Sequence, residues 1–173
     1  MRFRTIGNKY DVAFVVVHNS MTAKTIPQGA PVFFILNATN DGLDVRDANT
    51  AAGAGQEAIA GIVATNGGLQ PLGYGEAQVF GICPSTRIIT ATRTTSTDSY
   101  NSFTAISPFD ILAINTLSGY DALSRSGAGS ATAIVHNIIA AASYTSTASQ
   151  SSSFDTTSRT AITSTLKTFL RIL

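Results

Sequence analysis

Residues 107–123, SPFDILAINTLSGYDAL, constrain the fold more than any other part of the chain. A proline opens the stretch, and residues 109–114 then form an almost unbroken apolar run that is too short for a typical helix. Residues 116–119 supply turn chemistry, including a glycine that can adopt the positive φ of a tight return. Residues 120–123 resume the apolar pattern. The stretch therefore predicts strand, turn and strand, with the first strand buried on both faces.

Short apolar runs between glycine, proline and asparagine turns recur along most of the chain. They predict strands within residues 12–17, 25–36, 43–46, 58–64, 77–82, 87–93, 131–142 and 165–173. Gly61, inside one run, indicates a bulge or a close backbone approach. Residues 131–142 have a short helix as the alternative, which their β-branched side chains disfavour. Because no convincing crossover helix occurs, the pattern predicts an all-β fold, a single antiparallel β-barrel or sandwich.

Length and composition indicate one domain with an arm. A chain of 173 residues with 44% hydrophobic content can bury one sizeable core and is short for two. We expect residues 1–23 to form an extended N-terminal arm, whose single strand lies on its own body or on a neighbouring subunit. Residues 24–173 would form the β-barrel domain. Residues 143–164 are nearly a Ser/Thr tract and predict a long exposed loop.

The charge pattern narrows the classes of partner. Charged residues make up only 12% of the chain, and the net charge is +1. A chain this close to neutral has no basic field to condense on phosphates, so we expect no nucleic-acid partner. The apolar run at residues 11–17 is too short to span a membrane, and no small-residue cleavage pattern follows it. We therefore expect a protein that is neither bound to a membrane nor exported.

Catalytic chemistry has few candidates in this sequence. Only His18 and His136 could serve as a histidine base, and no G-x-S-x-G elbow accompanies them. Each lies in or at the end of an apolar run, which favours a hydrogen-bonded structural histidine. Gly53, Gly55 and Ala58 resemble half of a dinucleotide fingerprint, but they precede a strand, whereas that motif follows one and opens a helix. We therefore expect no enzymatic activity and no cofactor.

Metal-binding chemistry is equally sparse. Asp41, Asp44 and Asp47 lie three residues apart, but they lack the glycine and the terminal glutamate of an EF-hand loop. We interpret them as solvated turn acids. The single cysteine, Cys83, excludes an intrachain disulfide and a cysteine-cluster metal site, and it is expected to fill space in the core.

Taken in order, several phrases resemble the bacteriophage head decoration (capsid cement) proteins of the small β-barrel type. These phrases are DVAFVVVHNSMTAKTIPQGAPVFF, EAIAGIVAT, GYGEAQVFGIC, SPFDILAINTLSGYDAL and TLKTFLRIL. The resemblance spans most of the chain. Residues 94–102 and 143–164 depart from a minimal member, and we expect them to be outward-facing loops.

The resemblance implies a structural virion protein, made in the host cytoplasm, that stabilises an assembled head from its outer surface. Its partners would be the major capsid protein and two further copies of itself, in a homotrimer at three-fold or quasi-three-fold positions. The N-terminal arm would reach over coat subunits or a neighbouring protomer. Candidate contact residues in and after the arm are Arg2, Phe3, Arg4, Lys9, Tyr10 and Phe14.

Two other functions remain open. The first is a glycan- or receptor-binding β module of a phage fibre or surface protein, which the absence of tryptophan disfavours because sugar sites use exposed aromatic platforms. The second is a small hydrolase that uses His18 or His136 as its base.

Overall fold

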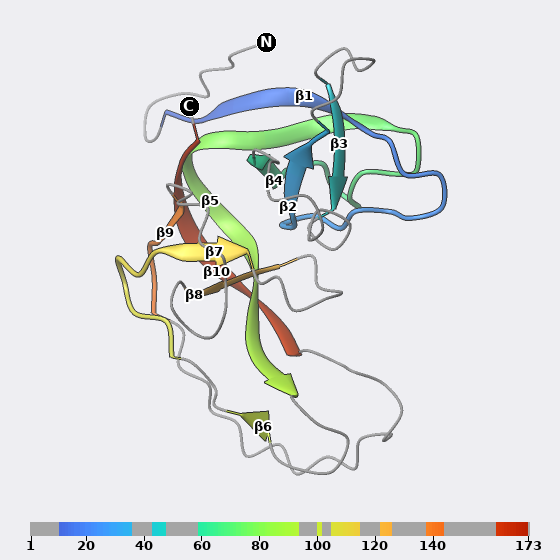
Figure 1. Ribbon diagram of the computed structural model, residues 1–173. Helices are drawn as coiled ribbons and strands as arrows, with labels where there is room; N and C mark the ends of the chain where they lie inside the picture. Colours follow the sequence, from blue (N-terminus) through green and yellow to red (C-terminus); the bar gives the residue numbers. More distant parts are fainter. Residues whose placement is uncertain are drawn as a thin grey trace.

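The computed structural model describes residues 11–35, 43–47, 59–93, 100–101, 105–114, 122–125, 138–143 and 162–172 (Figure 1). Within these ranges the structure contains strands and no helix, so the predicted all-β class is confirmed. The strands are β1 (Ala13–Asn19), β2 (Pro31–Phe34), β3 (Asp44–Asp47), β4 (Ile59–Val63), β5 (Tyr74–Arg93), β6 (Tyr100–Asn101), β7 (Leu112–Ile114), β8 (Leu123–Arg125), β9 (Ile138–Ala140) and β10 (Ile162–Arg171).

The pairings of β1 to β5 close on themselves. β1 pairs with β3, β3 with β2, β2 with β4, β4 with β5, and β5 with β1 again. The pairs β1–β3 and β5–β8 are parallel, so the sheet is mixed and the prediction of a purely antiparallel sheet is wrong. The first parallel pair arises because β3 returns antiparallel to β2 and inserts between β2 and β1. We refer to these five strands as the ring.

β5 is the spine of the molecule (Figure 1). Its first half lies in the ring between β1 and β4, and its second half pairs with β10, β8 and β6. The sequence predicted two strands here, at residues 77–82 and 87–93, because Pro84 follows the first apolar run. Instead, Pro84 and Ser85 lie opposite the single Lys167 of β10, since Cys83 pairs with Thr168 and Thr86 with Leu166. A bulge tolerates a proline without ending the strand.

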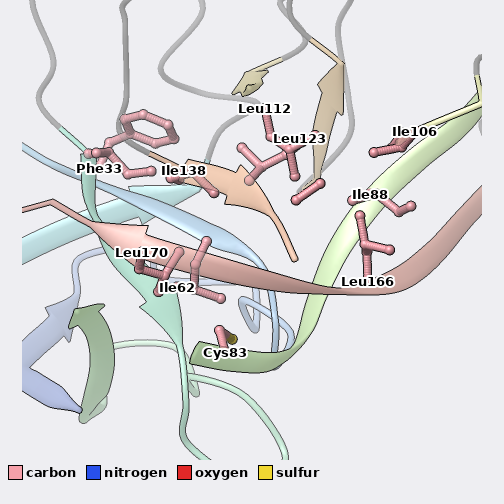
Figure 2. Close-up of a cluster of buried hydrophobic side chains, with 12 residues drawn as sticks. Phe33, Ile62, Cys83, Ile88, Ile106, Leu112, Leu123, Ile138, Leu166 and Leu170 are labelled. Carbon is pink, nitrogen blue, oxygen red and sulfur yellow. The ribbon is translucent and has the colours of Figure 1, made fainter. Parts of the chain in front are cut away.

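Two clusters of buried side chains fill the structure. The first lies inside the ring and includes Val17, Val32 and Val63. The second lies between the ring and β7 to β10 and includes Phe33, Ile62 and Leu170 (Figure 2). All five residues of β4 are buried, because Ile59 and Ile62 point into the second cluster whereas Ala60 and Val63 point into the first. The free Cys83 lies in the second cluster, as predicted.

The hairpin predicted within residues 107–123 is present, but it begins later. β7 and β8 pair antiparallel, with Leu112 opposite Arg125. Ahead of them, the N–H of Asp110 donates to the carbonyl of Ser107, so residues 107–110 form a turn. Phe109 is 85% exposed and Ile111 is 48% exposed, so the prediction of burial on both faces is wrong for them. The cause is Pro108, which presets the second position of a turn and moves the strand start to Leu112.

Other predictions fall partly within the described residues. The first predicted strand had two possible placements, and the structure shows that β1 pairs within its own chain. β9 confirms a strand in the C-terminal part of residues 131–142, whereas His136 lies outside the described residues. In β10 the alternation is as predicted: Leu166, Thr168 and Leu170 are buried. The prediction of a loop at residues 143–164 is wrong for residues 162–164, which begin β10, and the loop expected at residues 94–102 contains β6. Residues 144–161 and the glycine motif at residues 53–58 lie outside the described ranges.

A close approach explains Gly61, as predicted. A Cβ atom there would lie 2.7 Å from the carbonyl oxygen of Gln78 on the neighbouring β5. Opposite it, the register of β2 shifts between Val32 and Phe33, which is the expected bulge.

Candidate functional site

β5 and the strands beside it carry several aromatic side chains that belong to neither buried cluster. Ala77, Val79 and Cys83 point into the two buried clusters. Successive side chains alternate between the faces of a strand, so Tyr74 and Glu76 point outward. The pairing of β5 with β1 then shifts register between Gln78 and Phe80, so Phe80 does not continue that outward face.

β1 extends this surface on one side of β5. Phe14 pairs with Gln78, Val16 with Glu76, and His18 with Tyr74, so these β1 side chains share the outward face. Val16 is 40% exposed and Tyr74 is 66% exposed. The ring centroids of His18 and Tyr74 are 4.6 Å apart, as expected for direct cross-strand partners.

Beyond the register shift, β5 pairs with β10, and β10 pairs with β9. Phe169 pairs with Ile82 of β5 and with Ile139 of β9, and Ile139 forms a bridge with Ile111. Phe80 and Phe169 meet edge to face, with centroids 5.8 Å apart. The side chains of Phe14, Val16, His18 and Tyr74 share one face of β1 and β5, and we call these four residues the aromatic face.

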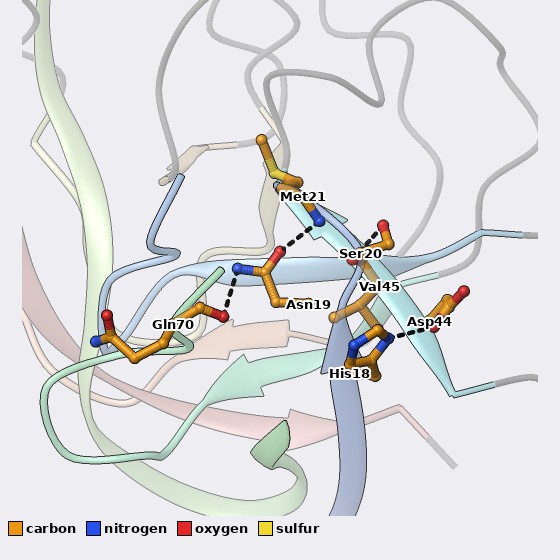
Figure 3. Close-up of polar contacts among 7 residues, drawn as sticks. All are labelled: His18, Asn19, Ser20, Met21, Asp44, Val45 and Gln70. Atoms are coloured by element: carbon orange, nitrogen blue, oxygen red, sulfur yellow. Dashed lines mark hydrogen bonds and ion pairs between the residues drawn. The ribbon is translucent and has the colours of Figure 1, made fainter. Parts of the chain in front are cut away.

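His18 is the most chemically versatile residue on this face. Its Nδ1 lies 2.6 Å from Oδ1 of Asp44, which is its direct partner on β3 (Figure 3). A carboxylate on one ring nitrogen fixes the orientation of an imidazole, as it does in catalytic triads and metal sites. A triad would also need a serine hydroxyl as the partner of His18. The hydroxyl of Ser20, two residues along the chain, instead donates to the carbonyl of Val45 at 3.2 Å. The described contacts of His18 thus make it a hydrogen-bonded residue, as its structural interpretation predicted.

The acids of β3 are not the solvated turn residues that the sequence indicated. Asp44 is half-buried and holds His18, whereas Asp47 is buried and forms an ion pair with Lys24. They occupy a strand because β3 pairs with β1 on one side and with β2 on the other. Asp41 lies outside the described residues. Among the residues that the structure places, no three of the side chains His, Cys, Asp and Glu gather closely enough to hold a metal.

Asn19, which sequence reasoning missed, fixes the end of β1. Its side-chain amide is fully buried and donates to the carbonyls of Lys24, Leu69 and Gln70 at 2.9 to 3.1 Å. Its Oδ1 accepts the N–H of Met21 at 3.0 Å (Figure 3). The only signal in the sequence is a polar residue close to the end of an apolar run, one position after His18. Asn19 thereby anchors the turn at residues 70–73 to β1.

The turn at residues 70–73 and the turn at residues 107–110 have the same backbone geometry. In each, the fourth N–H donates to the first carbonyl, at 3.0 Å for Gly73 to Gln70 and 3.1 Å for Asp110 to Ser107. A proline occupies the second position of each turn. The third position is Leu72 with φ of 53° or Phe109 with φ of 71°, the two non-glycine residues with positive φ in the described chain. We call Leu72 and Phe109 the tips.

Both tips are exposed, Leu72 by 56% and Phe109 by 85%. A second layer of hydrogen bonds holds the Phe109 turn in place. The N–H of Ser107 donates to the Asp110 carboxylate at 2.8 Å, and the N–H of Phe109 donates to the carbonyl of Ala140 at 2.8 Å. The fold therefore presents a large apolar side chain on a rigid turn at each of these two places.

The predicted contact residues fall in two groups. Arg2, Phe3, Arg4, Lys9 and Tyr10 lie outside the described residues. Phe14 lies half-buried on the aromatic face, opposite Gln78.

Comparisons with known proteins found no match: no family model, no curated protein and no solved structure is similar to this chain. Across the part of the chain that is described, no helix has the length and apolar character needed to cross a membrane.

Proposed function

We propose that this chain is a structural virion protein, a capsid decoration or cement protein that binds the outer surface of an assembled phage head as a trimer. The observation that carries the proposal is the pair of tips, Leu72 and Phe109. It adds to the resemblance of the strand sequences to head decoration proteins. No catalytic step is needed for this role.

The tips are unfavourable features of an isolated chain. An L-residue in the left-handed region costs roughly 1–2 kcal/mol, and turns of this kind favour glycine or asparagine at the third position. Leu72 and Phe109 also gain little from burial within their own chain, since both are exposed. Strained, exposed and rigidly held apolar residues are typical of binding sites. Burial of one such side chain in a partner would contribute about 1.5–3 kcal/mol.

A cement role uses such anchors in a specific way. A protein that binds the assembled lattice, but not the free coat subunit, stabilises the assembled state by linkage. Two anchors on one chain, and three chains in a trimer, act together at a high effective concentration. Modest contacts at each tip are therefore sufficient.

Co-sedimentation with phage heads tests the proposal. The purified chain would be mixed with expanded empty heads, and separately with free coat protein, of the phage that encodes it. We expect binding to heads in a fixed ratio, no binding to free coat protein, and the mass of a trimer by light scattering. Binding to neither target would contradict the decoration role.

Variants of the tips sharpen this test. Asparagine accepts the left-handed region, so Leu72→Asn and Phe109→Asn remove the apolar side chain and relieve the strain together. We expect each variant to unfold at the same or a higher urea concentration than the parent, yet to bind heads at least tenfold more weakly. Asn66→Ala, in an exposed loop, is the control and should bind heads normally. Full head binding by both tip variants would show that the tips are not the anchors.

A glycan- or receptor-binding module is the second candidate, and one observation favours it. Tyr74 exposes 66% of its surface beside the His18–Asp44 pair, which combines an aromatic platform with polar groups for hydroxyls. A glycan array would test it: a signal that Tyr74→Ala abolishes and Asn66→Ala preserves supports this candidate. An array without any signal would remove it.

A further inference from the structure

We propose that Asn66 is a site of spontaneous modification, where the side-chain amide is lost and the chain comes to carry aspartate or isoaspartate. The site is the turn at residues 65–68, between β4 and β5, in which the N–H of Gly68 donates to the carbonyl of Thr65 at 3.0 Å. Asn66 and Gly67 form the one Asn-Gly step in the sequence. The inference goes beyond the proposed function and does not depend on it.

The reaction joins two atoms that are close neighbours along the chain. The backbone nitrogen of Gly67 gives its proton to hydroxide and attacks Cγ of Asn66, which closes a five-membered succinimide ring. The bond from Cγ to the side-chain nitrogen breaks, and that nitrogen takes up a proton from water and leaves as ammonia. Water then opens the ring at either of its two carbonyl carbons, which gives aspartate or isoaspartate at position 66. Water is the only co-reactant, and no oxidation or reduction occurs.

The turn leaves both reacting groups accessible. Asn66 and Gly67 are exposed, and a Cβ atom at Gly67 would meet nothing within 4 Å. Within the part of the chain that is described, no hydrogen bond holds the side chain of Asn66 or the N–H of Gly67. Glycine also has the widest range of backbone conformations, so the turn can reorient until the nitrogen faces the amide carbon.

Asn19 shows the opposite arrangement in the same chain. Its side chain is fully buried and is bonded through both Nδ2 and Oδ1. The nitrogen that would have to attack it belongs to Ser20, and the N–H of Ser20 donates to the carbonyl of Val45 at 3.1 Å. Release of these bonds would open the end of β1. We therefore expect Asn19 to react only in the unfolded chain, and it serves as an internal control.

Isoaspartate changes the main chain as well as the charge. It adds one carbon atom to the backbone between residues 66 and 67. The next residue cannot move to absorb this atom, because the backbone of Gly68 packs so closely on Ile26 that a Cβ atom would overlap the Ile26 carbonyl oxygen. Leu69 and Ile26 also exchange two backbone hydrogen bonds, at 2.8 and 2.9 Å. The isoaspartate form should therefore be less stable than a chain with ordinary aspartate at this position.

Incubation of the folded, full-length chain at physiological temperature tests the inference. Peptide mapping by mass spectrometry would follow each site, and an isoaspartyl methyltransferase with a labelled methyl donor would detect isoaspartate. We expect the peptide that contains Asn66 to gain one mass unit, faster as the hydroxide concentration rises, while Asn19 stays unchanged. In a chain unfolded by urea, both sites should convert. An intact Asn66 in the folded chain, under conditions where the unfolded chain has converted, would overturn the inference.

Two variants separate this site from other sources of isoaspartate. Gly67→Ala places a methyl group beside the attacking nitrogen and should slow conversion at least tenfold. Asn66→Gln keeps an exposed amide but needs a larger ring, so it should give almost no isoaspartate at this position. Isoaspartate in Asn66→Gln at the level of the parent would contradict the assignment to Asn66.

The stability of the product completes the test. Exchange of one exposed polar side chain for another changes stability little, so Asn66→Asp should unfold at nearly the same urea concentration as the parent. The converted chain should contain a fraction that unfolds at a lower urea concentration than Asn66→Asp. Equal midpoints would show that the turn accommodates the added backbone atom, which would contradict the argument from Gly68.

Discussion

Gly67 and Gly68 show how one residue's surroundings decide the effect of a substitution. They are neighbours in the turn between β4 and β5, with φ of 79° and 84°. A Cβ atom at Gly67 would meet nothing within 4 Å, whereas one at Gly68 would overlap the carbonyl oxygen of Ile26. The backbone strain of a substitution is thus the same at both positions, and only the steric cost differs.

We therefore predict different losses of stability for the two alanine variants. Gly67→Ala should lower the free energy of unfolding by roughly 1–2 kcal/mol, from backbone strain alone. Gly68→Ala should lower it by roughly 2–5 kcal/mol, because Ile26 bonds to Leu69 through both its N–H and its carbonyl and cannot move aside freely. Urea unfolding of the two variants would measure the difference. Equal losses would mean that the contact with Ile26 is relieved at little cost.

At the scale of elements, β5 and β10 are joined by a buried polar contact as well as by their backbone ladder. The hydroxyls of Thr86 and Thr168 lie 2.6 Å apart, and both residues are fully buried. A buried hydroxyl without a hydrogen-bond partner lowers the free energy of unfolding by about 1–3 kcal/mol. Replacement of both hydroxyl groups by apolar groups of similar shape changes it little. The two threonines therefore form a unit.

A double-mutant cycle checks this prediction. Thr86→Val and Thr168→Val should each lower the free energy of unfolding by about 1–3 kcal/mol, because each leaves one hydroxyl buried without this partner. The double variant should be close to the parent, which gives a large coupling energy. Additive losses in the urea unfolding of the three variants would contradict the prediction.

At the scale of the whole molecule, closure of the ring depends on β1. Val15 and Val17 of β1 are buried in the ring, and β1 satisfies backbone groups of both β3 and β5. Burial of two valines contributes about 3–6 kcal/mol, which is comparable with the total stability of a typical domain. The strand that the sequence assigned to an arm is thus part of the folded body.

Two truncations test the role of β1. Removal of residues 1–10 leaves every pairing of β1 in place, so this variant should keep a cooperative urea transition. Removal of residues 1–23 deletes β1, and we expect this variant to lose the cooperative transition. Circular dichroism during urea titration would follow both. A cooperative transition of unchanged midpoint in the longer truncation would show that the ring does not need β1.

Local signals in the sequence were sufficient for the strand class and for many strand positions. The alternation of buried and exposed side chains in β10 could be predicted, because burial on one side of a strand requires apolar residues at every second position. The close backbone approach at Gly61 could be predicted, because only glycine leaves room for a neighbouring backbone. The aromatic face was not recognised as a surface, because its residues come from two strands, β1 and β5, that are far apart in the sequence.

The sequence by itself determined that this chain forms strands with little helix-forming pattern, because residue type and spacing act over a few neighbouring positions. Only the tertiary structure decided that Pro84 lies in a bulge of one long strand, that Asp44 holds His18, and that Leu72 and Phe109 form exposed tips. Each of these depends on contacts between residues far apart in the chain or on a turn fixed by such contacts. Pairing register and side-chain direction are set when the whole sheet packs, and no local pattern encodes them.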